Sequence, residues 1–318
     1  MMIHTVFIDG EAGTTGLKIR ERLQGRDEIK VIELSKKNRK IIEARAEALN
    51  SVDVAILCLP EDVSKEAVSL IENCNVRVID ASVAYRTHSD WVYGFPEYER
   101  GHREKIINAN RVSNPGCYAC GAISILHPLI KSGLILKDDP VTINAVSGYT
   151  GGGKKLISEF QNTTLASNGN KAFYHYALNL EHKHTEEIRQ HSGLTRRPIF
   201  VPSVGRFAQG MIVSVPLQLW ALSGKPKPGD IYNVLSDHYA GQRFVVVVDK
   251  ENTTKTFDNL DPEALNNTNQ LKLYVFENEG HEQAVVAVIL DNLGKGASGQ
   301  AVQCLNLMLG LNEEKGLQ

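Results

Sequence analysis

The sequence predicts an α/β fold in two parts. The first part is a Rossmann-type domain with a parallel sheet, and the second is an α+β domain with a largely antiparallel sheet. Short apolar runs alternate with helix-like segments near the N-terminus, as they do in βαβ units. A glycine-rich turn, Gly10–Gly16, joins the first expected strand to the first expected helix. The later apolar runs are longer and closer to alternating, which is typical of an antiparallel sheet with one covered face.

The elements follow from these patterns in chain order. In the first part we expect strands at residues 5–9, 30–34, 52–59 and 77–80, and helices at 17–23, 41–49 and 61–72. A helix at 117–130 follows a turn, and strands are expected at 141–146, 199–201, 211–219, 244–248, 271–276 and 284–290, before a last helix at 300–309. The predicted domains are a dinucleotide-binding domain, residues 1–116 with 293–318, and a catalytic and oligomerisation domain, residues 117–292.

Composition excludes several classes of protein. The 318 residues carry 35 Lys and Arg against 37 Asp and Glu, a net charge of −2, which argues against a nucleic-acid binder. Hydrophobic residues make up 42% and charged residues 23%, as in ordinary globular proteins. No apolar run approaches the about 20 residues of a membrane helix. Five cysteines without a secretory signal favour reduced thiols and a cytoplasmic location.

Three glycines, Gly10, Gly13 and Gly16, form the pattern G-x-x-G-x-x-G between a strand and a helix. Glycine allows the backbone to approach a pyrophosphate closely, and a helix N-terminus offers free N–H groups to the anion. We therefore predict a dinucleotide site that also includes Thr14 and Thr15. The alternative is a plain glycine-rich turn, because the spacing departs from G-x-G-x-x-G.

The end of the second strand bears on the choice between NAD and NADP. An acidic residue there would bind the ribose 2′-hydroxyl. Here Glu33 is expected inside the strand, and the following loop reads Ser-Lys-Lys-Asn-Arg-Lys from Ser35. A basic loop with a hydroxyl suits a 2′-phosphate, so we predict NADP, bound by Ser35 and Lys36. The alternative is a solvated run of charge on the surface.

The segment Ser-Asn-Pro-Gly-Cys-Tyr places Cys117 in the first turn of a helix, three residues after Asn114. A free thiol has a pKa of about 8.5. Lowering it by two units requires about 2.7 kcal/mol, whereas a helix N-terminus usually contributes about 0.3–1 kcal/mol. A nucleophilic Cys117 therefore needs a further partner, for which a histidine is the best candidate. Asn114 is a candidate substrate ligand. The alternative for Cys117 is a small buried hydrophobic residue.

The candidate partner lies in the segment Glu-His-Lys-His-Thr-Glu-Glu from Glu181. His182 and His184 are two residues apart, so they do not share a helix face, and either one could be the acid or base. Glu187 could orient an imidazole ring or bind substrate. The alternative is the charged start of a surface helix. Cys117 and Cys120 also spell C-x-x-C, but without a second such pair we predict no metal, and a redox pair is a minor alternative.

Four other residues complete the candidates. Arg86 and Arg206 could each bind a carboxylate or phosphate with two hydrogen bonds, or form surface ion pairs instead. Ser147 and Gly148 begin a second glycine cluster, which could hold the cofactor with its backbone groups.

These motifs together resemble one family. The motifs are GEAGTTG at Gly10, DASVAYR at Asp80, YGFPE at Tyr93, SNPGCY at Ser113, SGYTGGGK at Ser147, EHKHTEE at Glu181 and DNLGKGASGQAV at Asp291. In this order they are similar to the shorter form of the N-acetyl-γ-glutamyl-phosphate reductases. More distant resemblances are to aspartate-semialdehyde dehydrogenase and to the glyceraldehyde-phosphate dehydrogenase fold.

The resemblance implies NADPH-dependent reduction of N-acetylglutamyl 5-phosphate to the semialdehyde, with release of phosphate, in arginine biosynthesis. It implies a thioester on Cys117, proton transfer by His182 or His184, and a homodimer or homotetramer. Ser203 stands where some members have a histidine, so no catalytic histidine is expected at that position. The competing functions are a dehydrogenase that acts on aspartyl phosphate, a non-catalytic NADP sensor and a thiol-redox protein.

Overall fold

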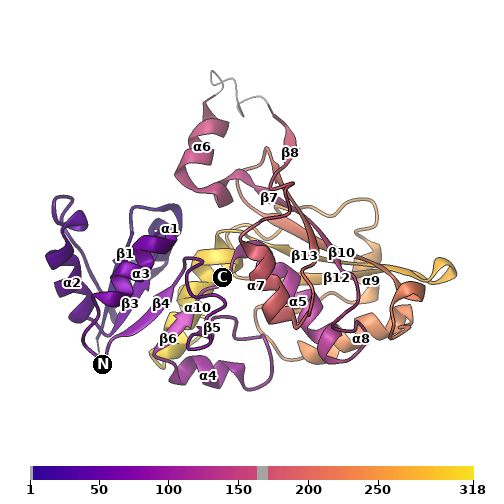
Figure 1. Ribbon diagram of the computed structural model, residues 1–318, viewed down its shortest axis with the longest axis horizontal. Helices are drawn as coiled ribbons and strands as arrows, with labels where there is room; N and C mark the ends of the chain where they lie inside the picture. The colour runs from indigo at the N-terminus through magenta and orange to yellow at the C-terminus, as the bar shows by residue number, and fades with distance from the viewer. Residues whose placement is uncertain (1–2, 163–170) are drawn as a thin grey trace. The chain divides into compact units, whose positions relative to one another are not determined.

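The computed structural model describes residues 3–162 and 171–318. The chain forms two compact units (Figure 1). Unit 1 comprises Met1–Pro96, Arg100–Gly116 and Ala297–Gln318, and unit 2 comprises Glu97–Glu99 and Cys117–Gly296. Residues 97–99 and 293–296, which we expected in the first domain, thus group with unit 2. An ion pair between the buried side chains of Glu97 and Lys295 connects these two segments.

Unit 1 is built on a six-stranded sheet in the order β2-β1-β3-β4-β6-β5, and every neighbouring pair is parallel. Its strands are β1 (His4–Asp9), β2 (Ile29–Ile32), β3 (Val54–Leu57), β4 (Arg77–Asp80), β5 (Val92–Tyr93) and β6 (Arg111–Ser113). Its helices are α1 (Thr14–Leu23), η1 (Asn38–Lys40), α2 (Ile42–Asn50), α3 (Glu61–Ser69), α4 (His102–Asn108) and α10 (Gly299–Met308). The predicted parallel sheet is confirmed.

Helices cover both faces of this sheet, and β1 shows how the sequence achieves it. Val6 and Ile8 pack into a core with apolar residues of α1, α4 and α10. Phe7 packs into a second core with residues of α2 and α3. Because successive side chains of a strand point to opposite faces, a run of apolar residues is needed where both faces are buried.

The glycine-rich turn occupies a special place in unit 1. It follows β1, which lies between β2 and β3, so the chain reverses its direction of winding across the sheet at this strand. In open parallel sheets, ligands bind in the crevice outside the carboxyl ends of the strands at such a point.

Unit 2 contains a seven-stranded sheet in the order β11-β12-β13-β10-β7-β9-β8. Its strands are β7 (Thr142–Gly148), β8 (Phe173–His175), β9 (Ile199–Gly205), β10 (Met211–Gln218), β11 (Val245–Val247), β12 (Leu271–Asn278) and β13 (Gln283–Leu290). Only β7 with β9 and β11 with β12 are parallel, so the prediction of a largely antiparallel sheet is confirmed.

The helices of unit 2 include α5 (Cys117–Lys131), α6 (Gly153–Gln161), α7 (His184–Ser192), α8 (Pro228–His238) and α9 (Lys250–Thr254), with the short turns η2 (Tyr149–Gly152), η3 (Leu219–Ala221) and η4 (Glu279–His281). A π-helical turn, η5 (Gly294–Ser298), precedes α10. Helix α5 is almost entirely buried. A Cβ atom on Gly121 would lie 2.8 Å from the Val213 Cγ2 atom of β10, so glycine permits this close packing.

The structure differs from the expected elements in several places. The sequence did not reveal β5 and β6, because strands of two or three residues are too short to show a period. Strand β2 ends at Ile32, so Glu33 follows the strand and does not lie inside it as expected. In residues 3–162 and 171–318, none of the helices combines the length and the apolarity that crossing a membrane would require.

Candidate active site

The glycine turn of unit 1 is closely packed. Gly10 has a φ of +86°, and a Cβ atom there would lie 2.3 Å from the carbonyl oxygen of Cys58. A Cβ atom on Gly16 would lie 2.7 Å from the carbonyl oxygen of Gly10. Helix α1 begins at Thr14 without a capping side chain, because its N-cap residue is Gly13. These features leave uncapped N–H groups at the helix start, which fits a site for a dinucleotide pyrophosphate.

The loop after β2 carries the residues proposed for the 2′-phosphate. Ser35 and Lys36 are exposed. Glu33 forms an ion pair with Arg20 of α1, and Arg39 forms one with Glu11 of the glycine turn. The acidic group at the end of β2 is therefore neutralised by a basic residue of this chain.

The segment before Cys117 is held within unit 1. The Asn114 amide N donates to the carbonyl oxygen of Asp80 over 2.7 Å, and its side-chain nitrogen donates to the carbonyl of Ala297 over 3.0 Å. Arg86 is buried and donates to the backbone carbonyls of Asn114 and Ala81 over 3.0 and 3.1 Å. Arg86 thus supports this segment through its backbone, a role that the sequence did not suggest.

Cys117 is the first residue of α5 and is half-buried. The next residue, Tyr118, lies against both candidate histidines: its ring centroid is 5.8 Å from that of His182 and 5.9 Å from that of His184. The two imidazoles are 4.8 Å apart. Folding therefore brings the predicted cysteine segment and the histidine segment into one cluster within unit 2.

A second tyrosine, Tyr176, completes this cluster. Its hydroxyl lies 3.2 Å from His182 Nε2, and its side chain also hydrogen-bonds to that of Tyr118. Burial raises the pKa of Tyr176, and the negative charge that Cys117 would carry as a thiolate raises it further. Tyr176 is thus within electrostatic reach of Cys117, and we had not identified it from the sequence.

His182, Tyr176 and Tyr118 form a row of hydrogen bonds. The backbone groups at the two ends of this row fix the direction of each bond. At one end, the backbone N–H of His184 donates to His182 Nδ1 over 3.1 Å. A neutral His182 must therefore carry its proton on Nε2, which donates to Tyr176. At the other end, the Tyr118 hydroxyl donates to the carbonyl oxygen of Ser203 over 2.8 Å, so it accepts from Tyr176. Both ring nitrogens of His182 are consequently occupied within the protein.

Ser203 itself brings an unexpected imidazole to this region. It lies on β9 opposite His175 of the edge strand β8, and His175 Nδ1 is 2.8 Å from Ser203 Oγ. From the sequence we expected no catalytic histidine at position 203, and His175 was not among the candidate residues. The sequence did not indicate this contact, because His175 and Ser203 are 28 positions apart in the chain and meet only through strand pairing.

The remaining candidates of unit 2 lie on α7, on β7 and directly after β9. Glu187 is buried in α7, whereas its neighbour Glu186 is exposed and pairs with Arg189. The amide of Gly148 donates to the carbonyl of Gly210 over 2.9 Å.

The other two candidates, Ser147 and Arg206, also have partners within unit 2. Ser147 Oγ donates to the carbonyl of Gly148 over 3.1 Å, and the Ser147 side chain also hydrogen-bonds to that of Tyr118. Arg206 is exposed, and its guanidinium lies 5.9 Å from the centroid of the Phe160 ring.

Cys120 does not support a redox pair with Cys117. It is fully buried, and burial raises the pKa of its thiol to about 12. Its sulfur lies 3.9 Å from the carbonyl oxygen of Lys295, to which the thiol donates. A thiol that stays protonated is a poor attacking group in disulfide exchange. Among the described residues, no group of His, Cys, Asp and Glu side chains is suited to hold a metal ion.

Comparisons with known proteins cover nearly the whole chain. Residues 5–106 match the family described as "Semialdehyde dehydrogenase, NAD binding domain", and residues 117–292 match "Semialdehyde dehydrogenase, dimerisation domain". The N-acetyl-gamma-glutamyl-phosphate reductase of Trichormus variabilis is 50% identical over 317 residues, which cover 98% of each chain. That of Brucella ovis is 52% identical over 310 residues, covering 96% of this chain and 98% of the relative.

Solved structures agree in fold at low sequence identity. The aspartate semialdehyde dehydrogenase II of Vibrio cholerae has a TM-score of 0.69 at 17% identity, and covers 98% of this chain and 99% of its own. A probable aspartate-semialdehyde dehydrogenase of Pseudomonas aeruginosa has a TM-score of 0.71 at 16% identity, with 97% and 99% covered.

The hydrogen-bond row predicts the tautomer of His182. In the neutral protein, the Nε2 atom of His182 should carry the proton and Nδ1 should not. The ¹⁵N chemical shifts of the two ring nitrogens, measured on ¹⁵N-histidine-labelled protein above neutral pH, report this directly. A protonated Nδ1 in neutral His182 would contradict the assignment. His281, which lies in the exposed turn η4, is a reference for an ordinary mixture of tautomers.

Proposed function

Because the chain belongs to the N-acetyl-γ-glutamyl-phosphate reductase family, we propose that it reduces N-acetyl-L-glutamyl 5-phosphate to N-acetyl-L-glutamate 5-semialdehyde and phosphate with NADPH, as a step of arginine biosynthesis. The observation that carries the proposal in this chain is the position of Cys117 at the start of α5, beside the hydrogen-bonded row of Tyr118, Tyr176 and His182. A cysteine nucleophile, a nearby imidazole and a dinucleotide domain are the groups that an acyl-phosphate reduction needs.

In the proposed mechanism, the Cys117 sulfur attacks the carbonyl carbon of the acyl phosphate. Backbone N–H groups of the first turn of α5 stabilise the oxyanion that forms. The bond to phosphate breaks, phosphate leaves with the electron pair, and a thioester to Cys117 remains. A nicotinamide dinucleotide held by unit 1 would supply the hydride needed to reduce this thioester. The C–S bond then breaks, which releases the aldehyde and regenerates the Cys117 thiolate.

We assign to His184 the acceptance of the Cys117 thiol proton as the sulfur attacks, and its return to the Cys117 thiolate after the aldehyde leaves. His182 is constrained by the His184 amide on one side and by Tyr176 on the other, so it serves to position the tyrosines. His184 lies in the same cluster and is 5% exposed. The substrate would bind to Asn114, Arg206 and Glu187. Arg86 would act indirectly, through its hydrogen bond to the Asn114 backbone.

The cofactor would be held by unit 1. Gly10, Gly13 and Gly16, with Thr14 and Thr15, would surround the pyrophosphate at the start of α1. Ser35 and Lys36 would bind the 2′-phosphate, which favours NADP over NAD. The ion pair between Glu33 and Arg20 supports NADP, because a paired Glu33 carboxylate is less available to bind the ribose 2′-hydroxyl of NAD. Ser147 and Gly148 remain candidates for contact with the cofactor.

We further propose a homodimer or homotetramer in the cytoplasm. The family model matched by residues 117–292 is that of a dimerisation domain. Several apolar residues of the sheet in unit 2 are exposed and could be covered in an oligomer, including Val285 at 37% and Ile199 at 52%. All five cysteines are free, which suits a reducing compartment.

The direct test is the reverse reaction. The protein should reduce NADP in the presence of phosphate and N-acetylglutamate semialdehyde. It should do so at a kcat/KM at least about 100-fold above that for aspartate semialdehyde, since buried polar groups of a site reject substrates that leave them unpaired. A preference for aspartate semialdehyde would refute the proposed substrate and leave the reaction class intact.

Replacing the nucleophile should abolish turnover without harming cofactor binding. We expect Cys117→Ser to lower kcat by a factor of about 10³ or more, because a serine hydroxyl is a far weaker nucleophile than a thiolate. The affinity for NADPH, measured by fluorescence titration, should stay within about twofold. The control is Cys74→Ser, which changes an exposed cysteine. Full activity of Cys117→Ser would exclude the thioester.

The two histidines should differ in their effects. We expect His184→Asn to lower kcat by about 10²–10⁴, the usual contribution of general acid–base catalysis. His182→Asn should cost less, and Tyr176→Phe should reproduce its effect, because both break the same hydrogen bond. Steady-state kinetics of the three variants provide the measurement. A larger loss in His182→Asn than in His184→Asn would reverse the assignment.

The loop after β2 should set the cofactor preference. We expect Lys36→Glu to raise the KM for NADPH by about 10-fold or more, since a charged hydrogen bond contributes about 1.5–3 kcal/mol, while the KM for NADH stays nearly constant. The matched control is Lys30→Glu, the same charge change at an exposed position of β2. Equal effects of both variants on NADPH would show a general electrostatic effect instead of a contact.

A further inference from the structure

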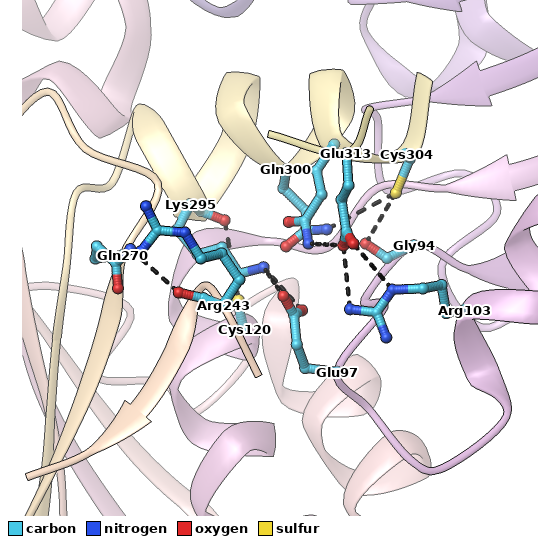
Figure 2. A network of polar contacts seen from close by, with 11 residues as sticks. Gly94, Glu97, Arg103, Cys120, Arg243, Gln270, Lys295, Gln300, Cys304 and Glu313 are labelled. Carbon is cyan, nitrogen blue, oxygen red and sulfur yellow. Dashed lines mark hydrogen bonds and ion pairs between the residues drawn. The ribbon is translucent and has the colours of Figure 1, made fainter. Parts of the chain in front are cut away.

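Unit 2 contains an ion pair that is completely buried. The side chains of Glu97 and Lys295 are both 0% exposed, and Lys295 Nζ lies 2.9 and 2.8 Å from the two carboxylate oxygens of Glu97. Figure 2 shows the ammonium group pointing at this carboxylate. Apolar residues of similar volume often stabilise a core at least as well as a buried ion pair, because both charges lose their hydration. Stability alone therefore does not explain the pair.

Lys295 belongs to the π-helical turn η5, and π-helical turns are frequent at functional sites. The next residue, Gly296, lies directly against Cys117. A Cβ atom on Gly296 would be 2.8 Å from the Cβ atom of Cys117 and 3.3 Å from its Cα atom. Only the absence of a side chain permits this contact, so the position of the turn and the position of Cys117 depend on each other.

The same turn is fixed by further contacts of Lys295. Its carbonyl oxygen accepts from the thiol of Cys120, one helical turn beyond Cys117, as Figure 2 also shows. Its ammonium group lies 5.7 Å from the centroid of the buried Phe244 ring. Gly296 N donates to the carbonyl of Asp291 over 2.9 Å. The ion pair with Glu97 is thus one of several contacts that fix η5, and two of the others, with Cys117 and Cys120, lie on α5.

We propose that Glu97 and Lys295 are positioning residues for Cys117: their ion pair holds η5 so that the Gly296 backbone fixes the first turn of α5 and with it the sulfur. This inference rests on the proposed role of Cys117 as nucleophile. An ion pair with two hydrogen bonds has one favoured arrangement, whereas apolar side chains pack in several. Misplacement of a reacting group by about 1 Å can cost about 10²-fold in rate.

The test compares stability with the reactivity of Cys117. The double variant Glu97→Leu/Lys295→Met replaces the ion pair by an apolar pair, so its Tm should stay close to that of the unchanged protein. The rate of alkylation of Cys117 by iodoacetamide should fall by about tenfold or more, and kcat should fall with it. The KM for NADPH should not change. Mass spectrometry of the peptide 112–131 measures the alkylation of Cys117 without requiring turnover.

A matched control is the buried pair of Arg26 and Glu28 in unit 1, whose side chains are 5% and 3% exposed. The variant Arg26→Met/Glu28→Leu should leave the alkylation rate of Cys117 unchanged. A wild-type alkylation rate and kcat in Glu97→Leu/Lys295→Met would overturn the proposal, since the pair would then be structural only.

If the double variant does not fold, Glu97→Asp decides, because it keeps the charge and shortens the side chain by one methylene. The alkylation rate of Cys117 should fall in Glu97→Asp. It should recover in part in Glu97→Asp/Lys295→Arg, because the longer arginine side chain restores the contact with the shortened carboxylate. An unchanged rate in Glu97→Asp would equally overturn the proposal. Retained activity of Cys117→Ser would instead refute the nucleophile itself, and the alkylation result would still report on the positioning.

Discussion

A row of hydrogen bonds that begins and ends on the backbone determines the polar side of the candidate active site. The amide of His184 and the carbonyl of Ser203 are rigid groups of a helix and a strand. Between them, His182, Tyr176 and Tyr118 have only one consistent arrangement of protons. Side chains held in this way lose little further freedom when a substrate binds, which is the physical basis of preorganisation.

The two cysteines of α5 differ in their surroundings, and the proposed role of Cys117 requires its sulfur to be accessible. Cys117 is half-buried at the start of the helix. Cys120, one turn later, is sealed in the core, where burial raises its pKa to about 12. Two cysteines three residues apart therefore differ in chemistry because the helix turns one toward the interior and leaves the other at its end.

The buried ion pair near α5 also depends on precise geometry. Removing charge from water is unfavourable, so the Glu97–Lys295 pair persists only with good geometry. That geometry is transmitted to Cys117 through a contact with Gly296, at which no other residue type fits without movement. Packing that is this close transmits small displacements, because protein interiors are dense.

Predictions from local patterns succeeded where the physics is local. The turn at Gly10, the helix start at Cys117 and the parallel strands all follow from residues that are neighbours in the chain. Predictions about individual side chains were less complete. Arg86 resembles a ligand for an anion, but it is buried and bonded to backbone carbonyls. Glu33 was expected in a strand, but β2 ends one residue earlier and Arg20 neutralises its charge.

The sequence alone predicts the fold class, the candidate nucleophile and the segment that contains its candidate partner, since each prediction depends on periodicity or on adjacent residues. Only the folded chain distinguishes the two histidines, adds Tyr176 and His175, and joins Glu97 to Lys295. The reason is that these contacts connect residues far apart in the chain. Hydrogen-bond direction and burial exist only once those residues have come together.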